Sequence, residues 1–366
     1  MASKVYFTDL RTHDEPLTHK LKRLLKTAGM DQIDFDGKYT AVKIHFGELG
    51  NLAFLRPNWA KAVCDMIKQQ GGKPFLTDCN TLYVGSRKNA LDHLDTAYEN
   101  GYSPFSTGCH VIIADGLKGT DEQIVPIDGD YVKEAKIGRA VMDADIIISL
   151  NHFKGHEGTG FGGAIKNLGM GCGSRAGKME QHSAGKPHVD PDACVGCGVC
   201  RKNCAHDAIT IENRKAFIDH DKCVGCGRCI GSCPKDAVHE AGDESNDILG
   251  RKMAEYAWAV CKDRPHFHVS LVIDISPFCD CHAENDAPIL PDIGMFASFD
   301  PVALDRACVD ACLKQEPIPH SHLTDMPHIC DDHFTNSQPA TNWRTQLAQA
   351  EKMGLGTQAY ELIVMK

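Results

Sequence analysis

Hydrophobic residues in the first 150 positions follow two alternating patterns, helical repeats and short apolar runs. One helix is predicted at residues 17–28. Its apolar residues Leu21, Leu24 and Leu25 lie three or four positions apart and would form one buried face. Gly29 follows and is expected to end the helix. Residues 145–150 show the other pattern, a short apolar run typical of a buried strand.

Along the chain, these patterns predict strands that alternate with helices. Strands are expected at 5–8, 39–45, 74–78, 111–114, 145–150, 268–274, 293–297 and 360–364, and helices at 17–28, 58–70, 91–100, 249–261, 301–314 and 343–353. This alternation is typical of an α/β fold with a mostly parallel sheet and helices on both faces. Ligands bind such sheets at the carboxyl ends of the strands. Polar loops follow three of these strands, at 43–48, 77–80 and 151–156.

Residues 188–240 interrupt the alternation of strands and helices with a cysteine-rich stretch. The alternation then resumes, so two domains in series are the less economical interpretation. We therefore expect one α/β domain, built from residues 1–187 and 241–366, that carries a small α+β insert.

Composition and charge narrow the function classes. The 366 residues carry 39 basic and 49 acidic side chains, a formal net charge of −10, whereas nucleic-acid binding usually relies on a basic surface. No apolar run approaches the ~18 residues of a membrane span, and the first residues lack an apolar signal core, so we expect a cytoplasmic protein. Eighteen cysteines in such a chain favour thiolate ligation of metal over disulfides.

Eight of the cysteines form an internal repeat within the insert. Each copy has the spacing C-x2-C-x2-C-x3-C, and the second copy begins 29 positions after the first. In this spacing, three thiolates of one copy hold a [4Fe–4S] cluster together with the last cysteine of the other copy. The predicted ligands are Cys194, Cys197, Cys200 and Cys233 for one cluster and Cys223, Cys226, Cys229 and Cys204 for the second. A pair of zinc sites or a disulfide knot is the alternative, which the duplicated spacing disfavours.

With these motifs the insert resembles the bacterial two-cluster ferredoxins. Pro234 follows Cys233, as is usual in that family, whereas Ala205 follows Cys204. Proline shapes the turn and binds no iron, so the resemblance still implies two clusters. Two neighbouring clusters form an electron relay, and we expect the insert to pass electrons from a redox partner protein to the larger domain. Because exposed clusters and thiols oxidise readily, an anaerobe or a facultative organism is the expected host.

A segment rich in glycine and lysine, residues 154–172, is the second candidate site. It leaves a strand and opens a predicted helix near Ala164, so amides, the helix N-terminus and lysines are expected to face a small anionic ligand or cofactor. The candidate ligand-binding residues are Lys43, Gly160, Gly162, Gly163 and Asn167, and the candidate catalytic residues are His45, Lys154, His156 and Lys166. A structural glycine turn with solvated lysines is the alternative. Neither GxxxxGK[ST] nor GxGxxG is present at the expected place, which argues against ATP and nicotinamide.

Cys279 and Cys281 form the third candidate site. Residues two positions apart on a strand point to the same side, so both thiols could face one ion. Further ligands could come from Asp274, Asp280, His282 and Cys172. Zinc, nickel or a further cluster suits such mixed soft ligands. The alternative interpretation is two half-buried thiols at a strand end, since free cysteine packs as a small hydrophobe.

Five stretches of the chain, residues 42–48, 154–170, 188–240, 274–281 and 300–305, carry a wider resemblance. Through them the chain is similar to a family of uncharacterised prokaryotic iron–sulfur proteins, in which an α/β domain of unknown function carries an inserted two-cluster ferredoxin. This resemblance implies the architecture and no particular reaction. The loop around Lys166 is also similar to one in nickel-pincer lactate racemases, where a lysine carries the cofactor, and Lys166 would be its counterpart.

These observations leave three functions open. The first is an electron-transfer protein or redox subunit, with two clusters that feed a cleft in the α/β domain. The second is an oxidoreductase that acts on a small anionic substrate, or uses a flavin, in that cleft. The third is a protein that handles a metallocofactor through Cys279 and Cys281, which predicts a third metal. Whether the chain is an enzyme is left open by its residues.

Overall fold

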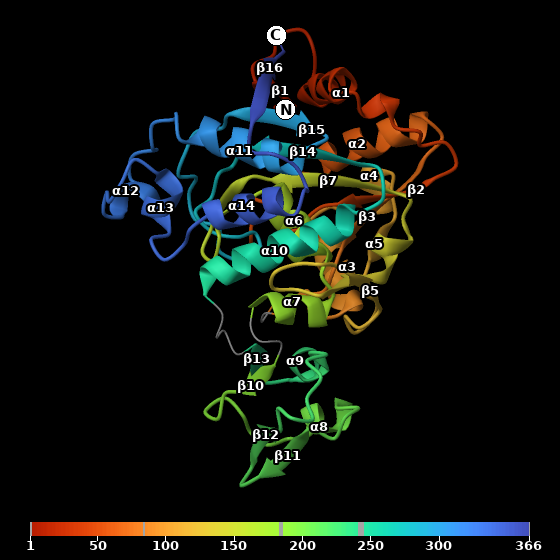
Figure 1. Ribbon diagram of the computed structural model, residues 1–366, viewed down its shortest axis with the longest axis vertical. Helices are drawn as coiled ribbons and strands as arrows, with labels where there is room; N and C mark the ends of the chain where they lie inside the picture. The colour runs from red at the N-terminus through yellow and green to blue at the C-terminus, as the bar shows by residue number, and fades with distance from the viewer. Residues whose placement is uncertain (1, 83–84, 183–185, 241–244, 366) are drawn as a thin grey trace.

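A central eight-stranded sheet organises the computed structural model, which describes residues 2–82, 85–182, 186–240 and 245–365. The strand order is β16-β1-β15-β14-β7-β2-β3-β4 (Figure 1). The strands are β1 (Ser3–Thr8), β2 (Tyr39–Lys43), β3 (Lys73–Asp78), β4 (Val111–Ile113), β7 (Ile146–His152), β14 (His266–Val272), β15 (Gly294–Ser298) and β16 (Tyr360–Val364). Within this sheet β15 runs antiparallel to both its neighbours, and the other pairs are parallel. The predicted α/β fold with a mostly parallel sheet is confirmed.

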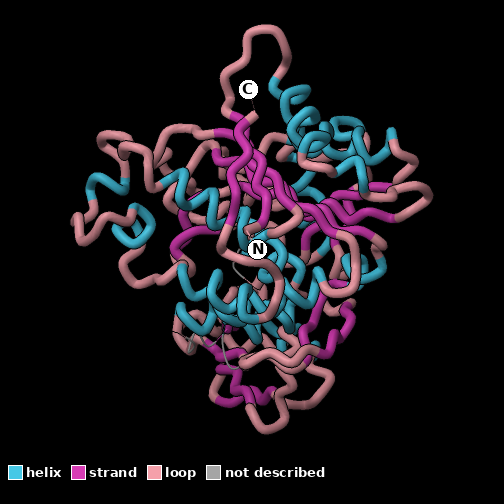
Figure 2. Tube along the Cα trace, turned by 45° about the horizontal axis from the view of Figure 1, so that its top comes forward, coloured by secondary structure: helices cyan, strands magenta, loops and turns pink. Residues whose placement is uncertain are grey.

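Helices cover both faces of the sheet (Figures 1 and 2). One face packs against α1 (Leu17–Thr27), α2 (Pro57–Gln69) and α3 (Ala90–Glu99), and the other against α6 (Ala164–Cys172), α10 (Asn246–Cys261), α11 (Pro301–Cys312) and α14 (Arg344–Lys352). Alternate residues of β7 enter opposite cores: Ile147 packs beneath α6 and α10, whereas Ile146 and Ile148 pack beneath α1 and α2. A strand buried on both faces therefore reads as a continuous apolar run.

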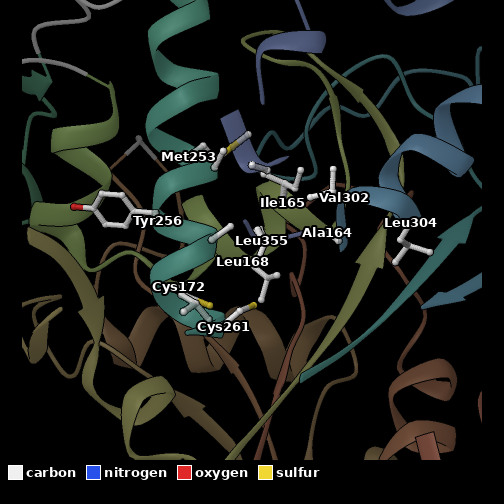
Figure 3. Packing of buried hydrophobic residues seen from close by; sticks show 14 of the residues in the cluster. Ala164, Ile165, Leu168, Cys172, Met253, Tyr256, Cys261, Val302, Leu304 and Leu355 are labelled. Carbon is white, nitrogen blue, oxygen red and sulfur yellow. The ribbon is translucent and has the colours of Figure 1, made fainter. Parts of the chain in front are cut away.

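The core beneath α6 and α10 fixes the helix that carries the glycine–lysine segment. Ile165 and Leu168 of α6 pack with Met253 of α10 and Val302 of α11 (Figure 3). The two helices approach closely at Gly169, where a side chain would collide with the carbonyl oxygen of Met253. This glycine therefore serves helix packing, and it holds α6 at a fixed height above the sheet.

Residues 186–240 form a small unit at one end of the molecule (Figure 1). It contains the strand pair β10 (Pro187–Val189) and β13 (Val238–Glu240), the pair β11 (Ile209–Glu212) and β12 (Lys215–Ile218), and the short helices α8 (Val199–Asn203) and α9 (Arg228–Ser232). Ile209 and Ile230 belong to its apolar cluster, to which Leu82 and Met179 of the larger part also contribute. The predicted boundary after residue 240 adjoins residues 241–244, which lie outside the described residues.

The sequence repeat of this unit is also a structural repeat. The carboxylates of Asp190 and Asp219, 29 positions apart, each accept the backbone N–H two residues on, at 2.8 and 3.0 Å. Their carbonyls accept the N–H groups of Cys194 and Cys223, each at 3.0 Å. Both copies therefore present their cysteines from the same local backbone geometry.

Several elements were not predicted, because they are short or glycine-rich. They are the hairpin β5 (Glu122–Pro126) and β6 (Glu134–Gly138), the hairpin β8 (Lys154–His156) and β9 (Gly160–Gly162), the helix α7 (Arg175–His182), and the short helices η1 (Met30–Gln32), α4 (Pro104–Thr107), α5 (Arg139–Asp143), α12 (His322–Asp325) and α13 (His333–Ser337). None of the helices in the described ranges has the length and apolar character needed to cross a bilayer.

The expected strand at 268–274 is wrong at its end. β14 stops at Val272, and Asp274 adopts a left-handed backbone with φ of 45°. Cys279 and Cys281 therefore lie in a loop, where the alternation of a strand does not apply.

Candidate functional site

A cavity opens at the carboxyl ends of neighbouring strands. Lys43 ends β2, Asp78 ends β3 and His152 ends β7, and the loop after β14 contributes Cys281. The cavity holds about 810 Å³ of empty space, counted with the solvent at its mouth. The polar loops that follow three strands in the sequence thus meet in one place, as parallel strands require.

Most of the candidate ligand-binding and catalytic residues line this cavity. They are Lys43, His45, Lys154, His156, Gly162, Gly163, Lys166 and Asn167. Gly160 lies elsewhere, because a side chain at this position would contact Thr341 and Trp343. Its φ of 78° suits the turn between β8 and β9, so its glycine serves the hairpin.

The N-terminus of α6 is closed by the protein itself. Asp305 of α11 accepts hydrogen bonds from the backbone N–H groups of Ala164 (2.7 Å) and Ile165 (2.9 Å). Burial raises the pKa of Asp305 to about 7, although these two hydrogen bonds oppose the shift. The anion expected at this helix end is therefore replaced by a carboxyl group of the chain.

Lys43 and Asn167 are held by each other and by the sheet. The Lys43 Nζ lies 2.8 Å from Asn167 Oδ1 and 3.1 Å from Asp78 Oδ1, and all three residues are buried. Burial acts to raise the pKa of Asp78, but the charge of Lys43 and its other cationic neighbours leaves that pKa below the usual value. The Asn167 amide also donates to the carbonyls of Lys43 and Leu150, which ties α6 to β2 and β7.

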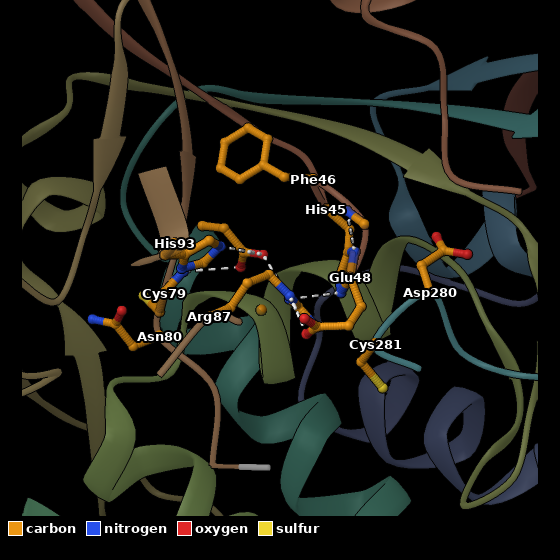
Figure 4. Close-up of polar contacts among 12 residues, drawn as sticks. His45, Phe46, Glu48, Cys79, Asn80, Arg87, His93, Asp280 and Cys281 are labelled. Atoms are coloured by element: carbon orange, nitrogen blue, oxygen red, sulfur yellow. Dashed lines mark hydrogen bonds and ion pairs between the residues drawn. The ribbon is translucent and has the colours of Figure 1, made fainter. Parts of the chain in front are cut away.

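His45 faces a buried ion pair that the sequence did not reveal (Figure 4). Arg87 Nε donates to Glu48 Oε2 at 3.0 Å, and Arg87 Nη1 lies 3.1 Å from His45 Nε2. Burial and the charge of Arg87 lower the pKa of His45 well below its usual value. His45 is therefore neutral at pH 7, which makes it a weak base for proton transfer.

Lys154 reaches Asp280 on the opposite side of the cavity. The Lys154 Nζ lies 3.5 Å from Asp280 Oδ2, and His152 Nδ1 lies 2.9 Å from the same oxygen. Burial would raise the pKa of Asp280, yet His152 and Lys154 lower it below its usual value. Asp280 therefore holds its negative charge and orders both side chains.

Cys279 and Cys281 converge with Lys166. The buried Cys279 Sγ accepts hydrogen bonds from Lys166 Nζ at 2.9 Å and from the Cys281 backbone N–H at 3.3 Å. Burial acts to raise the pKa of the Cys279 thiol, but the Cys281 thiol and the charges of Lys166 and Lys154 lower it well below its usual value. The pKa of Cys281 is raised, because its proton is shared with Cys279 and because it is buried. The pair thus holds one negative charge at Cys279 and one proton at Cys281.

Two groups of side chains in this region are compatible with metal binding. His156, Glu157 and Cys279 form one, and Glu157, Cys281 and His282 form the other; within each group the donor atoms lie within 4.8 Å of one another. His282 Nε2 pairs with Glu157 Oε1 at 2.9 Å. A cation at Cys279 would, however, meet the ammonium groups of Lys166 and Lys154, which disfavours a metal at that sulfur.

The other suggested ligands of this metal lie elsewhere. Cys172 packs in the apolar core near Cys261 (Figure 3). Asp274 faces Arg56, with 3.6 Å between Arg56 Nη2 and Asp274 Oδ2. Of the predicted ligands, His282 lies with the thiol pair, whereas Asp280 is paired with His152 and Lys154. Glu157, which was not predicted, is an additional neighbour of the thiols.

The eight cysteines of the repeat line two separate cavities. One is lined by Cys194, Cys197, Cys200 and Cys233, and the other by Cys204, Cys223, Cys226 and Cys229. In each cavity, three cysteines come from one copy of the repeat and the fourth comes from the other copy. Apolar side chains complete the linings, among them Ile211 and Val238 in the first cavity and Ile209 and Ile218 in the second.

The cysteines at α9, from both cavities, adjoin the sheet domain. The guanidinium of Arg175, on α7, lies against Gly231 of α9. It is near enough to interact electrostatically with Cys226 and Cys229. Lys88 pairs with Asp236 of the small unit. Met179 and Leu82 join the apolar cluster of the cysteines, and Leu82 also lines the main cavity.

Some site residues gave no signal in the sequence. Arg87 and Arg175 have partners that lie far along the chain, and Asp305 lies in an apolar helical repeat. Asp78 belongs to one of the three polar loops, so its position at a strand end was visible in the pattern. Pairs between distant positions require the fold and leave no local trace in the sequence.

Comparisons with known proteins identify the family but not the reaction. The family model described as a domain of unknown function, DUF362, matches residues 40–310. The thylakoid-associated protein sll1697 of Synechocystis sp. (strain ATCC 27184 / PCC 6803 / Kazusa) is 28% identical over 123 residues, and the match covers 34% of each protein. The chain thus spans about a third of the length of this curated relative.

Two solved structures share low similarity with the chain. The lactate racemase apoprotein of Thermoanaerobacterium thermosaccharolyticum matches with a TM-score of 0.39 at 10% identity, covering 74% of this chain and 51% of that one. A protein of Thermotoga maritima matches with a TM-score of 0.43 at 12% identity, covering 81% of this chain and 57% of that one. Both TM-scores are low, so these similarities carry no information about chemistry.

Proposed function

The chain belongs to the DUF362 family, whose function is unknown, and from its own residues we propose an iron–sulfur electron-transfer protein. In this proposal the small unit holds two [4Fe–4S] clusters that pass electrons from a redox partner protein to the cavity of the sheet domain. The expected setting is the cytoplasm of an anaerobe, because partly exposed thiolates and clusters oxidise readily.

The crossed grouping of the cysteines carries the proposal. Three cysteines of one copy share a cavity with the last cysteine of the other copy, in both directions. Two-cluster ferredoxins use this exchange of the fourth ligand. Separate zinc sites would more simply take all four cysteines from one copy. The exchange therefore favours cubane clusters over zinc.

The surroundings of the cysteines also suit iron–sulfur clusters. Backbone N–H groups donate to the sulfurs of Cys194, Cys204 and Cys233 at 3.3 to 3.4 Å. Such hydrogen bonds, together with an apolar lining, are the means by which a protein tunes cluster potential. The left-handed glycines Gly196 and Gly225, with φ of 66° and 72°, shape the first turn of each copy. A side chain at Gly196 would collide with Arg214.

The route to the cavity supports an internal relay. The cysteine set of α9 faces Arg175 and Met179 on α7, and Leu82 contacts both the apolar cluster of the cysteines and the cavity. An electron that reaches this cluster is therefore separated from the cavity by a few packed side chains. The helix α8, which carries Cys200 of the other set, lies farther from the sheet domain than α9 (Figure 1), and this set would accept electrons from the partner.

The test uses the full-length protein, purified without oxygen. We expect about eight irons and eight sulfides per chain and two paramagnetic centres after reduction with dithionite. Cys204→Ser should weaken the same signal as Cys226→Ser, whereas Cys233→Ser should weaken the same signal as Cys197→Ser. Cys312→Ser, in the core beneath α11, is the matched control and should leave both signals unchanged. Zinc in these positions, or no signal after dithionite, would overturn the proposal.

A small anionic substrate in the cavity is the second candidate, which would make the chain an oxidoreductase. Lys178 lines the cavity and donates to the backbone carbonyls of Gly171 and Gly173, which are neutral partners. Its charge therefore favours an anion, or a flavin with its phosphate. Lys178→Met should abolish a flavin absorbance that co-purifies with the protein, or binding of a candidate anion measured by calorimetry. Unchanged binding would argue against this site.

A further inference from the structure

Cys279 and Cys281 form a pair of neighbouring thiols that the proposed electron relay does not require. Cys279 is fully buried, whereas Cys281 is half-buried and lines the cavity. The Cys279 sulfur accepts hydrogen bonds from the Lys166 ammonium and from the Cys281 backbone N–H. A hydrogen bond also joins the two thiols, and of the two residues Cys281 lines the cavity whereas Cys279 does not.

We propose that Cys279 and Cys281 form a redox-active dithiol that reduces a disulfide bound in the cavity. Re-reduction of the pair by the two clusters rests on the proposed function, whereas the exchange with a disulfide does not. Each cluster carries one electron and the reduction of one disulfide takes two, so two clusters match one dithiol.

The geometry assigns a different role to each sulfur. The shared proton first moves from Cys281 to Cys279, and the Cys281 thiolate attacks the bound disulfide R–S–S–R to form a mixed disulfide and RS⁻. The leaving RS⁻ then takes the proton from Cys279 and becomes RSH. The Cys279 thiolate then attacks the Cys281 sulfur, and the second RS⁻ leaves. The products are the Cys279–Cys281 disulfide, one RSH and one RS⁻, so charge and protons balance.

The return step restores the resting pair. Two electrons, one from each reduced cluster, and one proton convert the Cys279–Cys281 disulfide into a thiolate and a thiol. Lys166 and Lys154 lie beside the sulfur that becomes the thiolate and stabilise its charge. A bridge between residues two positions apart is strained, and strained disulfides are the more easily reduced.

Charge separates this proposal from a metal site at the same thiols. Lys166 Nζ lies within 2.9 Å of the Cys279 sulfur, in the position that a bound cation would need. An ammonium group stabilises a thiolate and repels a divalent ion. Cys308 and Cys312 of α11 provide the contrast, since burial raises the pKa of both thiols and no lysine lies among the groups that shift them.

Trapping with glutathione disulfide tests the roles of the two sulfurs. The full-length protein is incubated with this probe without oxygen, quenched in acid, alkylated, digested and analysed by mass spectrometry. We expect wild-type protein to form the Cys279–Cys281 bridge, and Cys279→Ser to accumulate glutathione on Cys281. Cys281→Ser should react at least roughly tenfold more slowly, because the remaining sulfur is buried. Cys308→Ser is the matched control and should form the bridge at the wild-type rate.

Lys166 variants test the charge. Lys166→Met should slow formation of the bridge by roughly tenfold, because the resolving thiol loses its ammonium, while Lys166→Arg should keep most of the rate. Circular dichroism establishes that each variant is folded. Glutathione on either cysteine with equal yield, or an unchanged rate in Lys166→Met, would overturn the proposal. A stoichiometric metal ion that protects both thiols from alkylation would also overturn it and favour the metal site.

The two failures are distinguishable. The exchange can be followed with dithiothreitol as the reductant, which needs no clusters. If the bridge forms but dithionite-reduced protein shows no iron signal, the dithiol stands and the iron–sulfur proposal fails. If both signals are present and no bridge forms at any ratio of glutathione to its disulfide, the dithiol fails and the electron relay stands.

Discussion

Single residues in the cavity are paired by charge, which explains how so many ionic groups can be buried. Lys43 pairs with Asp78, Arg87 with Glu48, Lys154 with Asp280, and Lys166 with the Cys279 sulfur. A buried charge without a partner costs several kcal/mol, so each pair stabilises the fold only as a unit. A ligand that enters the cavity therefore meets side chains that are already paired. Substitution of one member of a pair should lower the stability of the fold by several kcal/mol.

Replacement of Lys43 tests this pairing. Lys43→Met leaves the Asp78 charge buried with the Cys79 backbone N–H at 2.9 Å and the Arg87 guanidinium at 3.9 Å. We expect the free energy of unfolding to fall by roughly 3–5 kcal/mol, measured by urea denaturation. Tryptophan fluorescence reports on the sheet domain alone, because all three tryptophans lie outside residues 188–240.

The double variant provides the control. Lys43→Met with Asp78→Asn removes both charges, so the loss should be clearly smaller than in Lys43→Met alone. Equal losses in the single and double variants would show that the pair contributes packing and not charge compensation.

Asp305 predicts a dependence of stability on pH. Its pKa is raised from 3.8 to about 7 by burial, so the folded state holds a proton that the unfolded state releases at lower pH. The contribution of Asp305 is therefore fully present below about pH 4 and is lost as pH rises towards 7. Against Asp305→Asn, the wild-type free energy of unfolding should decline by a few kcal/mol across this window. A constant difference between the two proteins from pH 4 to 8 would contradict the assignment.

At the scale of elements, the hydrophobic pattern was sufficient where an element is long and one-sided. The helix at α1 and the buried strand at β7 follow directly from residue spacing. The hairpin β8–β9 was not predicted, because most of its buried positions hold glycine, lysine or histidine and not the apolar residues that mark a buried strand. The sequence predicts Cys279 and Cys281 at the end of a strand, because the apolar run of β14 gives no sign of the left-handed turn at Asp274.

The cavity itself was predictable in outline, and its chemistry was predictable only in part. Polar loops after parallel strands must gather at one edge of the sheet, which located Lys43, His45 and Lys154. The closure of the α6 N-terminus by Asp305 was not predictable, because the carboxyl group arrives from a helix 141 positions farther along the chain. Contacts of this kind depend on how helices pack and not on local sequence.

The contact between α7 and α9 predicts an effect on one of the two proposed clusters. Arg175 places a positive charge near Cys226 and Cys229, and this charge favours the reduced cluster. Arg175→Met should lower the midpoint potential of the nearer cluster by an amount on the order of tens of millivolts, followed by redox titration with paramagnetic resonance. The farther cluster should keep its potential, and Arg175→Lys should shift the nearer one less. A shift of both potentials would indicate that the unit as a whole had moved.

At the scale of the whole molecule, two kinds of core hold the chain together. The sheet domain has an extensive apolar core on each face of the sheet, whereas the small unit has one cluster in which five of the eight repeat cysteines are themselves buried or partly buried members. A unit of this size seldom folds on its apolar core alone. The metal that its cysteines are proposed to bind would therefore supply much of its folding free energy.

Removal of iron should separate the two parts. After treatment with a chelator and ferricyanide, residues 186–240 should become sensitive to trypsin, which cleaves after Arg201, Lys215 and Arg228 of the small unit. Tryptophan fluorescence and the urea midpoint of the sheet domain should change little, because that domain keeps both of its cores. Untreated protein is the control, and rebuilding with iron and sulfide should restore resistance. If the small unit stayed resistant without iron, its fold would rest on apolar packing, and the cysteines would not act as structural ligands.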